Sequence, residues 1–260
     1  MTGHISFDVK RVTNITSIFM SLNGKAEVRW TTRTMSRRRT RTHTHKAEID
    51  LFTVITGNNA IGRTVLQEGA QVYPFTFQLP QGDFPSTFKG VHGRVVYFLK
   101  VEIHRSLHIT KVFETEFNFS RHIDSNHPQL LAPLSGSNSH MVWGLCCASG
   151  PVEMTVHLDR KGFVPGETIK IACEFRNSSL RSATPNATLV QNQKYSALDT
   201  SVRIECKTLD SVTGEPVKSG TLQAYSEMTL TIPDTSLSIS NCSIIDVNYD
   251  VLVTLSPCRS

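Results

Sequence analysis

The residues with the clearest chemistry form a basic run at positions 31–46, TTRTMSRRRTRTHTHK, which contains no acidic residue. Six cations lie in this run, and threonine and serine fill most of the remaining positions: Arg33, Arg37, Arg38, Arg39, Arg41 and Lys46. Because guanidinium groups hold phosphate oxygens bidentately, the run is a candidate phosphate- or anion-binding site. Phosphorylated receptor tails and anionic lipid headgroups are its candidate targets. The alternative interpretation is a solvated, self-repelling charge run.

The residues indicate no catalytic, metal-binding or nucleic-acid-binding chemistry. No aromatic side chains interleave with the arginines for base stacking, so nucleic-acid binding is not expected. His43 and His45 would share one face of an extended segment, but the sequence offers no obvious third ligand, and no metal site is predicted. No Gly-x-Ser-x-Gly elbow, P-loop, dinucleotide-binding fingerprint or His-Glu-x-x-His occurs. We therefore expect neither an enzyme nor a cofactor.

The composition describes an ordinary globular protein of one or two domains. The 260 residues are 39% hydrophobic and 19% charged, with a net charge of +5. No run approaches the ~20 apolar residues of a membrane span, and the N-terminus lacks an apolar stretch of signal-peptide length. The six cysteines include no Cys-x-x-Cys pair, which favours reduced thiols in the cytosol. For the adjacent Cys146 and Cys147, packing and a redox or palmitoylated pair are the alternatives.

The segment before the basic run predicts one long strand. Even-numbered positions over 18–30 are apolar or glycine, with no change of phase. A two-residue hairpin at Asn23-Gly24 would pair apolar side chains with charged ones on one face, so we interpret Gly24 as a bend or a close approach. A second strand begins at Ala47. The basic run between them is then a loop, or a poorly ordered hairpin tip.

Short alternating strands with proline and glycine turns continue to about residue 119. Phe75, Phe77 and Leu79 are predicted to alternate inward between bracketing prolines, and positions 95–103 and 113–119 give two further inward sets. This pattern is typical of an antiparallel β-sandwich. The aromatic side chains are expected in its core rather than around a ligand.

Residues 150–179 open a second unit. Positions 152–158 and 169–175 alternate between apolar and polar residues, which is the period of half-buried strands. Between them, Pro165 sets φ for the second position of a turn, and Gly166 can take the positive φ of a type II turn. Residues 120–149 lose periodicity and gain Pro, Ser, Asn and Gly, which predicts an interdomain linker.

Several of these motifs, in this order, resemble the arrestin family, in particular its α-arrestin branch of arrestin domain-containing proteins. The resemblance includes PFTFQLP and GRVVYFLKVEIHR in the first half, and GPVEMTVHLDRKGFVPGE and CSIIDVNY in the second. It implies a structural role for a set of motif residues: Trp30, Pro74, Phe75, Phe77, Leu79, Pro80, Gly93, Tyr97, Gly150, Pro151, Gly162, Pro165, Gly166, Glu167, Asn177, Cys242 and Tyr249. The implied fold is all-β, with two tandem immunoglobulin-like β-sandwiches. Their expected bounds are 1–121 for the N-domain, 122–149 for the linker and 150–260 for the C-domain.

The resemblance also implies a function. Such proteins are cytoplasmic adaptors, peripheral at the plasma membrane and endosomes, that bind the cytoplasmic tails of membrane receptors or transporters in endocytic trafficking and ubiquitin-dependent down-regulation. Anionic lipids are further candidate partners. WW-domain ubiquitin ligases are recruited through Pro-Pro-x-Tyr motifs, and this sequence contains no Pro-Pro pair.

The same resemblance leads us to expect that the first strands of the N-domain and the last strands of the C-domain are missing, which would leave both sandwiches incomplete. The alternative function, from a different class, is an arrestin-fold structural subunit of an endosomal sorting coat.

Overall fold

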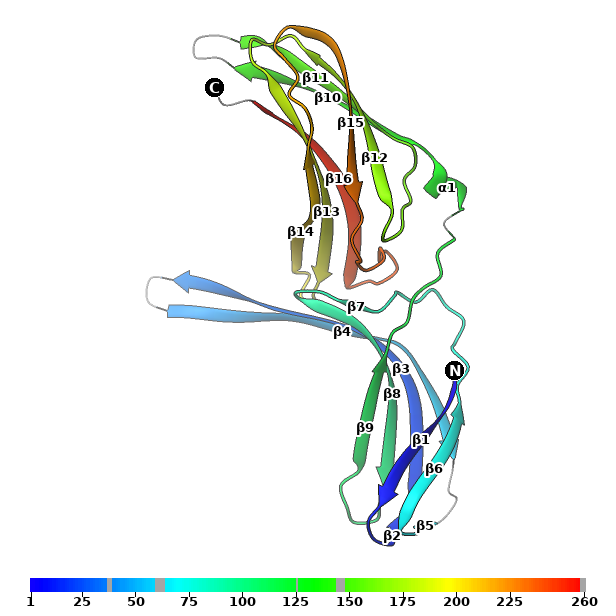
Figure 1. The fold of residues 1–260 in the computed structure, drawn as a ribbon. Coiled ribbons are helices and arrows are strands. Elements are labelled where there is room, and N and C mark those ends of the chain that lie inside the picture. The colour runs from blue at the N-terminus through cyan, green and yellow to red at the C-terminus, as the bar shows by residue number, and fades with distance from the viewer. Residues whose placement is uncertain (37–38, 59–63, 125, 144–147, 258–260) are drawn as a thin grey trace. The chain divides into compact units, whose positions relative to one another are not determined.

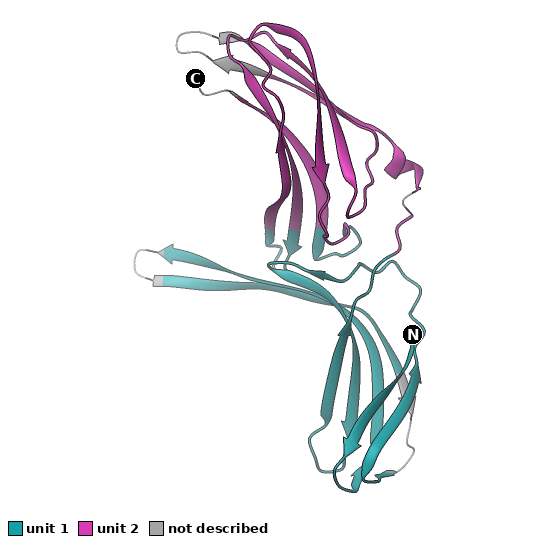
Figure 2. Cartoon of the chain, in the orientation of Figure 1, with its two compact units in different colours: residues 1–121, 194–203, 239–246 teal, residues 122–193, 204–238, 247–260 magenta. Residues whose placement is uncertain are grey.

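The chain forms two compact units that are built almost entirely from β-strands (Figures 1 and 2). The computed structural model describes residues 1–36, 39–58, 64–124, 126–143 and 148–257. Unit 1 comprises residues 1–121, 194–203 and 239–246, and unit 2 comprises 122–193, 204–238 and 247–260. The predicted fold class, two all-β sandwiches, is confirmed. The domain boundaries remain predictions, because two segments from the C-terminal half belong to unit 1.

Unit 1 packs a large antiparallel sheet against smaller two-stranded ones. The large sheet has the order β4-β3-β8-β7, with β9 also pairing β8, and the small ones are β1–β6 and β2–β5. The strands are β1 (Thr2–Val9), β2 (Thr13–Ile15), β3 (Ser17–Ser36), β4 (Arg39–Asn58), β5 (Thr64–Leu66), β6 (Gly69–Thr76), β7 (Phe88–Lys89), β8 (Gly93–His104) and β9 (Lys111–Phe117). Strand β1 was not predicted, although the alternation of Ile5, Phe7 and Val9 is a signal for it.

Strand β3 runs unbroken through Gly24, as predicted. A Cβ atom built on Gly24 would lie 2.7 Å from Cε1 of Tyr97 and 3.0 Å from Cε1 of Phe52. Tyr97 has no exposed surface, and its hydroxyl donates a 2.6 Å hydrogen bond to the carbonyl of Pro85. Burial raises the pKa of this phenol. Gly24 is therefore a close approach of backbone to a fixed aromatic side chain.

Two of the three residues predicted to alternate inward between the prolines at 74 and 80 are confirmed by the core of unit 1. Phe75 and Phe77 are buried in the cluster that also contains Leu22 of β3. Leu79 is 39% exposed, so the prediction for it is wrong. Because β6 ends at Thr76, the two-residue period no longer determines which way a side chain points beyond that residue.

Proline 74 lies inside β6 rather than at its boundary, where the sequence analysis places it. It is opposite His4 of β1 in a sheet of only two strands. Since β6 is an edge strand, a residue without an N–H group is tolerated there.

Two other motif residues, Trp30 and Cys242, are buried.

Unit 2 contains a four-stranded sheet, β10-β11-β12-β15, and a three-stranded sheet, β14-β13-β16. The elements are α1 (Pro128–Leu131), β10 (Leu134–Trp143), β11 (Ala148–Leu158), β12 (Thr168–Asn177), β13 (Ala183–Ser196), β14 (Val202–Thr213), β15 (Thr221–Thr231) and β16 (Ile245–Pro257). The predicted inward sets of β11 and β12 meet side chains of β13 and β15 in one apolar cluster.

Strand β10 lies within the predicted linker, which is a correction. Its residues show no apolar alternation, but they pair along β11 from Leu134 opposite Leu158 to Trp143 opposite Ala148. An edge strand is held by its backbone ladder, so its side chains need not alternate. Cys146 and Cys147 lie outside the described residues.

The turn between β11 and β12 confirms the prediction for Pro165 and Gly166. Gly166 has a φ of 89°, as a type II turn requires. The Glu167 carboxylate accepts hydrogen bonds from the Val164 N–H at 2.8 Å and from Arg160 at 2.9 Å, and these bonds lower its pKa. The turn motif is thus a self-contained hydrogen-bonded structure.

Two further motif positions in unit 2 hold a polar junction. Gly150 has a φ of 111°, and a Cβ there would lie 2.4 Å from the carbonyl oxygen of Ser178. The fully buried Asn177 amide donates to the carbonyls of Arg181, Val217 and Lys218 at 2.8–3.1 Å. Its Oδ1 accepts from the Ser179 hydroxyl at 2.7 Å. A buried amide with all these partners is a structural residue.

Candidate anion-binding site

The basic run forms the end of a long two-stranded arm in unit 1. Strand β8 pairs with β3 only as far as Val28, whereas β4 follows β3 to Ser36 opposite Arg39. Figure 1 shows the two strands continuing together past the end of β8. We define residues 29–36 and 39–46 as the basic arm. For these residues, the prediction of a loop or a poorly ordered hairpin tip is wrong, because they lie in two paired strands. Threonine favours extended backbone, and a strand ladder needs no apolar period.

The register divides the arm's cations between two faces. Side chains directly opposite each other lie on the same face of an antiparallel pair. Arg33, opposite Thr42, shares the outer face with Lys46, and Arg41, opposite Thr34, lies on the other face. All three are exposed. Arg39 is in the ladder opposite Ser36, and Arg37 and Arg38 lie outside the described residues.

The base of the arm is fixed on its inner face by an aromatic and polar cluster. The Trp30 ring stacks on His45, with centroids 5.3 Å apart. One nitrogen of His45 lies 2.8 Å from the Thr32 hydroxyl, and Nδ1 lies 2.7 Å from the Asp199 carboxylate. The bond from His45 lowers the pKa of Asp199. His45 therefore serves as an anchor of the arm.

On the outer face, two pairs of like charges lie next to each other across β3 and β4. Glu27 is opposite Glu48, and Arg29 is opposite Lys46. The acidic pair is neutralised, because Lys25 Nζ lies 2.7 Å from Glu48 and 3.6 Å from Glu27. The bond to Glu48 raises the pKa of Lys25. Arg94 adds a 2.5 Å contact to Glu27.

The basic pair has no such neutralisation. Among the residues that the structure describes, neither Arg29 nor Lys46 has an acidic side chain within ion-pair distance. Like charges directly opposite each other across two strands are unfavourable. The sequence analysis includes Lys46 but not Arg29, because only the register shows that the two side chains are neighbours.

A groove of about 600 Å³ lies at this base. Its charged lining includes four basic and two acidic side chains, and Val28, Ala47 and Leu198 give it an apolar wall. The basic ones are Arg29, Lys46, Lys89 and Arg94. Lys89 of β7 is opposite Arg94, is exposed, and was also not predicted. The groove can therefore hold an anion against both cations and apolar surface.

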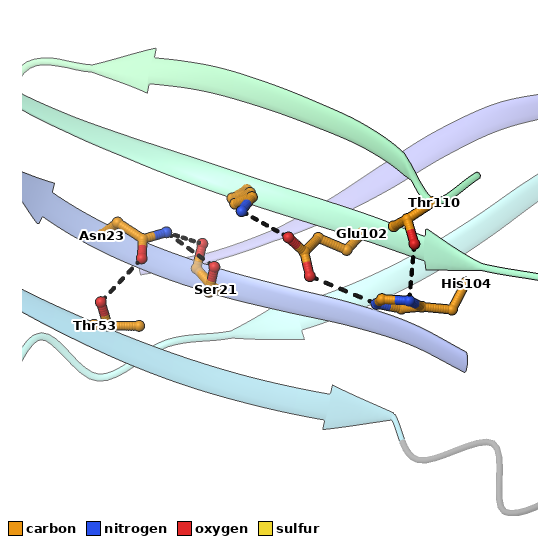
Figure 3. Close-up of polar contacts among 7 residues, drawn as sticks. Ser21, Asn23, Thr53, Glu102, His104 and Thr110 are labelled. Atoms are coloured by element: carbon orange, nitrogen blue, oxygen red, sulfur yellow. Dashed lines mark hydrogen bonds and ion pairs between the residues drawn. The ribbon is translucent and has the colours of Figure 1, made fainter. Parts of the chain in front are cut away.

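The opposite end of the same outer face carries paired charges (Figure 3). Lys100 Nζ lies 2.6 Å from Glu102, and His104 lies 3.5 Å from the same carboxylate. The Thr110 hydroxyl is 3.1 Å from the other ring nitrogen of His104. The contact with Lys100 lowers the pKa of Glu102.

A second network at this end consists of neutral groups. The Asn23 amide donates to the Ser21 hydroxyl at 2.9 Å and accepts from Thr53 at 3.1 Å, as Figure 3 shows. Polar side chains on this part of the sheet therefore bond to one another, and they leave little charge for an external ligand.

Comparisons with known proteins agree with this architecture. The family model "Arrestin (or S-antigen), N-terminal domain" matches residues 1–126, and "Arrestin (or S-antigen), C-terminal domain" matches residues 148–259. The chain therefore belongs to the arrestin family. Its relatives include arrestin domain-containing protein 4 of Mus musculus, 33% identical over 74% of this chain and 46% of the relative. Thioredoxin-interacting protein of Rattus norvegicus is 28% identical over 98% of this chain and 65% of the relative.

These relatives agree with the α-arrestin branch that the sequence motifs indicate. The chain spans about half to two-thirds of their length. In the described part of the chain, no helix has the length and apolar character needed to cross a membrane.

Proposed function

We propose that this chain is an arrestin-type adaptor that binds the cytoplasmic tails of membrane receptors or transporters during endocytic trafficking. The double sandwich and the arrestin-family matches support the adaptor class. Localisation in the cytoplasm, at the plasma membrane and on endosomes, and a role in ubiquitin-dependent down-regulation, belong to the same proposal. No residue of this sequence is assigned to ligase recruitment, since it contains no Pro-Pro pair.

The observation that carries a specific role is the basic arm. Arg33, Arg41 and Lys46 are exposed on two strands that extend beyond the rest of their sheet, and no acid occurs over positions 31–46. Such a surface attracts phosphate groups, because neighbouring acids do not compete for the guanidinium donors. We assign the arm the phosphate groups of phosphorylated cargo tails.

The test uses immobilised cytoplasmic-tail peptides from receptors and transporters, each with and without phosphoserine, and measures retention of the purified chain. We expect phosphorylated tails to be retained, and the fourfold variant of Arg37, Arg38, Arg39 and Arg41 to Ser to lose at least tenfold in affinity, since several charge-assisted contacts are removed.

The matched control removes four exposed cations elsewhere, Lys10, Arg11, Lys111 and Lys170, and should keep the affinity. Equal losses in both variants would show that only net charge matters. If the folded chain retains no tail at all, the adaptor proposal is rejected. Retention on phosphoinositide vesicles but on no peptide would make the arm a lipid-binding element.

A further inference from the structure

We propose that the groove at the base of the basic arm binds a compact ligand that carries two or more phosphate groups, whether free in solution or exposed as a lipid headgroup. This site uses Arg29 and Lys46 at the base of the arm, whereas the test of the proposed cargo role changes Arg37, Arg38, Arg39 and Arg41.

Two adjacent like-charge pairs on the outer face differ in whether they have a countercharge. Glu27 and Glu48 have Lys25 placed between them, and Arg94 adds a second cation. Arg29 and Lys46, the next pair on the same face, have no acidic side chain of the described residues within ion-pair distance. An unneutralised pair of cations on residues whose Cβ atoms lie about 5 Å apart is a site at which an anion relieves repulsion and forms charge-assisted hydrogen bonds at once.

The nearby acids compete only weakly with a ligand for Arg29 and Lys46. Both groove carboxylates already have cations within 2.5–2.7 Å. Asp199, next to the groove residue Leu198, is bound to His45 and accepts from the Ser201 N–H at 3.2 Å. Glu27, Glu48 and Asp199 are thus held by other partners. They do not compete with a ligand for Arg29 and Lys46.

The size of the groove and the position of Lys89 bear on the size of the ligand. Lys89 lines the same groove from β7, two strands beyond β3 in the order β4-β3-β8-β7. Neighbouring strands lie about 4.8 Å apart, so its backbone is roughly 10 Å from β3. Lys89 and the Arg29–Lys46 pair are therefore two groups of cations on different strands of one groove, and a ligand with two or more phosphates can contact both groups at once. A volume of about 600 Å³ is that of a small-molecule site.

Isothermal titration of the whole chain with inorganic tripolyphosphate at low salt tests the proposal. We expect saturable binding, weakened about tenfold by Arg29→Ser and by Lys89→Ser. Each variant removes one charge-assisted contact. The control variants Lys10→Ser and Lys111→Ser, which remove equal charge from exposed positions, should bind as the parent does. Glu48→Gln should tighten binding several-fold, because it removes a groove acid and frees Lys25.

A parallel measurement uses vesicles containing phosphatidylinositol 4,5-bisphosphate, against phosphatidylserine vesicles of equal charge. A groove-dependent loss with tripolyphosphate indicates a soluble ligand, and a loss only with the bisphosphate vesicles indicates a headgroup; both support the site. Unchanged binding by both groove variants in both assays overturns it, provided that circular dichroism melting shows the parent fold. Groove-dependent binding of a doubly phosphorylated peptide alone also overturns it, in favour of a peptide site.

The fourfold arm variant separates this site from the proposed cargo role. It should lose phosphorylated tails but keep tripolyphosphate binding. If it loses tripolyphosphate while Arg29→Ser and Lys89→Ser do not, the tip is the only anion site and the groove proposal is rejected.

Discussion

On the outer face of the large sheet in unit 1, the charged side chains at one end are paired and those at the other end are not. At the paired end, which we call the closed end, Lys100 and His104 both lie beside Glu102. At the other end, which we call the open end, Arg29 and Lys46 lie opposite each other, and neither has an acidic side chain of the described residues within ion-pair distance. Both ends use the outer face of β3 and its neighbours. The strands differ, because β8 and β9 continue the sheet at the first end whereas only β4 follows β3 beyond Val28 at the second. The placement of acids decides whether the cations at each end are paired.

This comparison shows why a count of charges is a poor guide to a binding surface. A cation that is already paired gains little from an external anion, since it must first lose its partner. A cation placed beside another cation gains both attraction and relief from repulsion. The acidic pair Glu27–Glu48 lies between the two ends, and Lys25, which contacts both carboxylates, reduces the repulsion between them.

The largest effect should come from Gly24, which lies on β3 between the two ends. Gly24→Ala places a methyl group 2.7 Å from the fixed Tyr97 ring. We expect the free energy of unfolding, measured in urea, to fall by about 1–3 kcal/mol, as overpacking of a filled core usually costs. The control Gly136→Ala, whose Cβ would meet nothing within 4 Å, should change it by less than about 0.5 kcal/mol. An unaffected Gly24→Ala would mean that the ring can move.

The second prediction adds an acidic side chain beside the unpaired cations of the open end. Thr31 is on the outer face, two residues from both Arg29 and Arg33, and Thr31→Glu supplies the missing acid. We expect tripolyphosphate affinity to fall about tenfold, with no loss of thermal stability, because the new carboxylate competes for the cations. Thr229→Glu, at an exposed position of unit 2, adds the same charge and should leave the affinity unchanged. Equal reductions would reduce the comparison to net charge.

The smallest effect should come from opening the closed end with Glu102→Gln. Because the pair lies at the sheet surface and is partly exposed, the loss of stability near pH 7 should be about 0.2–1 kcal/mol. Lys100 lowers the pKa of Glu102 below its ordinary 4.5. The contribution is therefore present above that value and is lost as pH falls through the folded-state pKa. Urea unfolding of both proteins from pH 3 to 7 should show a gap that closes in acid, and groove affinity should not change.

Local patterns predicted much of the fold. Alternation identified β3, β11 and β12, because a strand with one buried face records that face in every second residue. The Pro165–Gly166 turn was predictable from the same kind of local chemistry. Leu79 was mispredicted because the strand ends before it, and β10 was missed because backbone pairing alone holds it.

The candidate site was predictable only in part. The arginines of the arm stand out in the sequence, since they are consecutive or nearly so. Arg29 and Lys89 do not, because each is an ordinary exposed cation until the strands are aligned. Lys89 reaches the groove through β7 and β8, which places it in the same lining as Lys46, 43 residues earlier in the chain.

The sequence by itself determined that the chain forms strands, where several of them lie, and that one segment carries cations without acids. Those properties depend on residues within a few positions of each other. Only the tertiary structure decided which charges cancel, since Glu27, Glu48 and Arg94 come from three strands and meet through their register. Coulombic attraction depends on distance in space. The open and closed ends are therefore a property of the sheet.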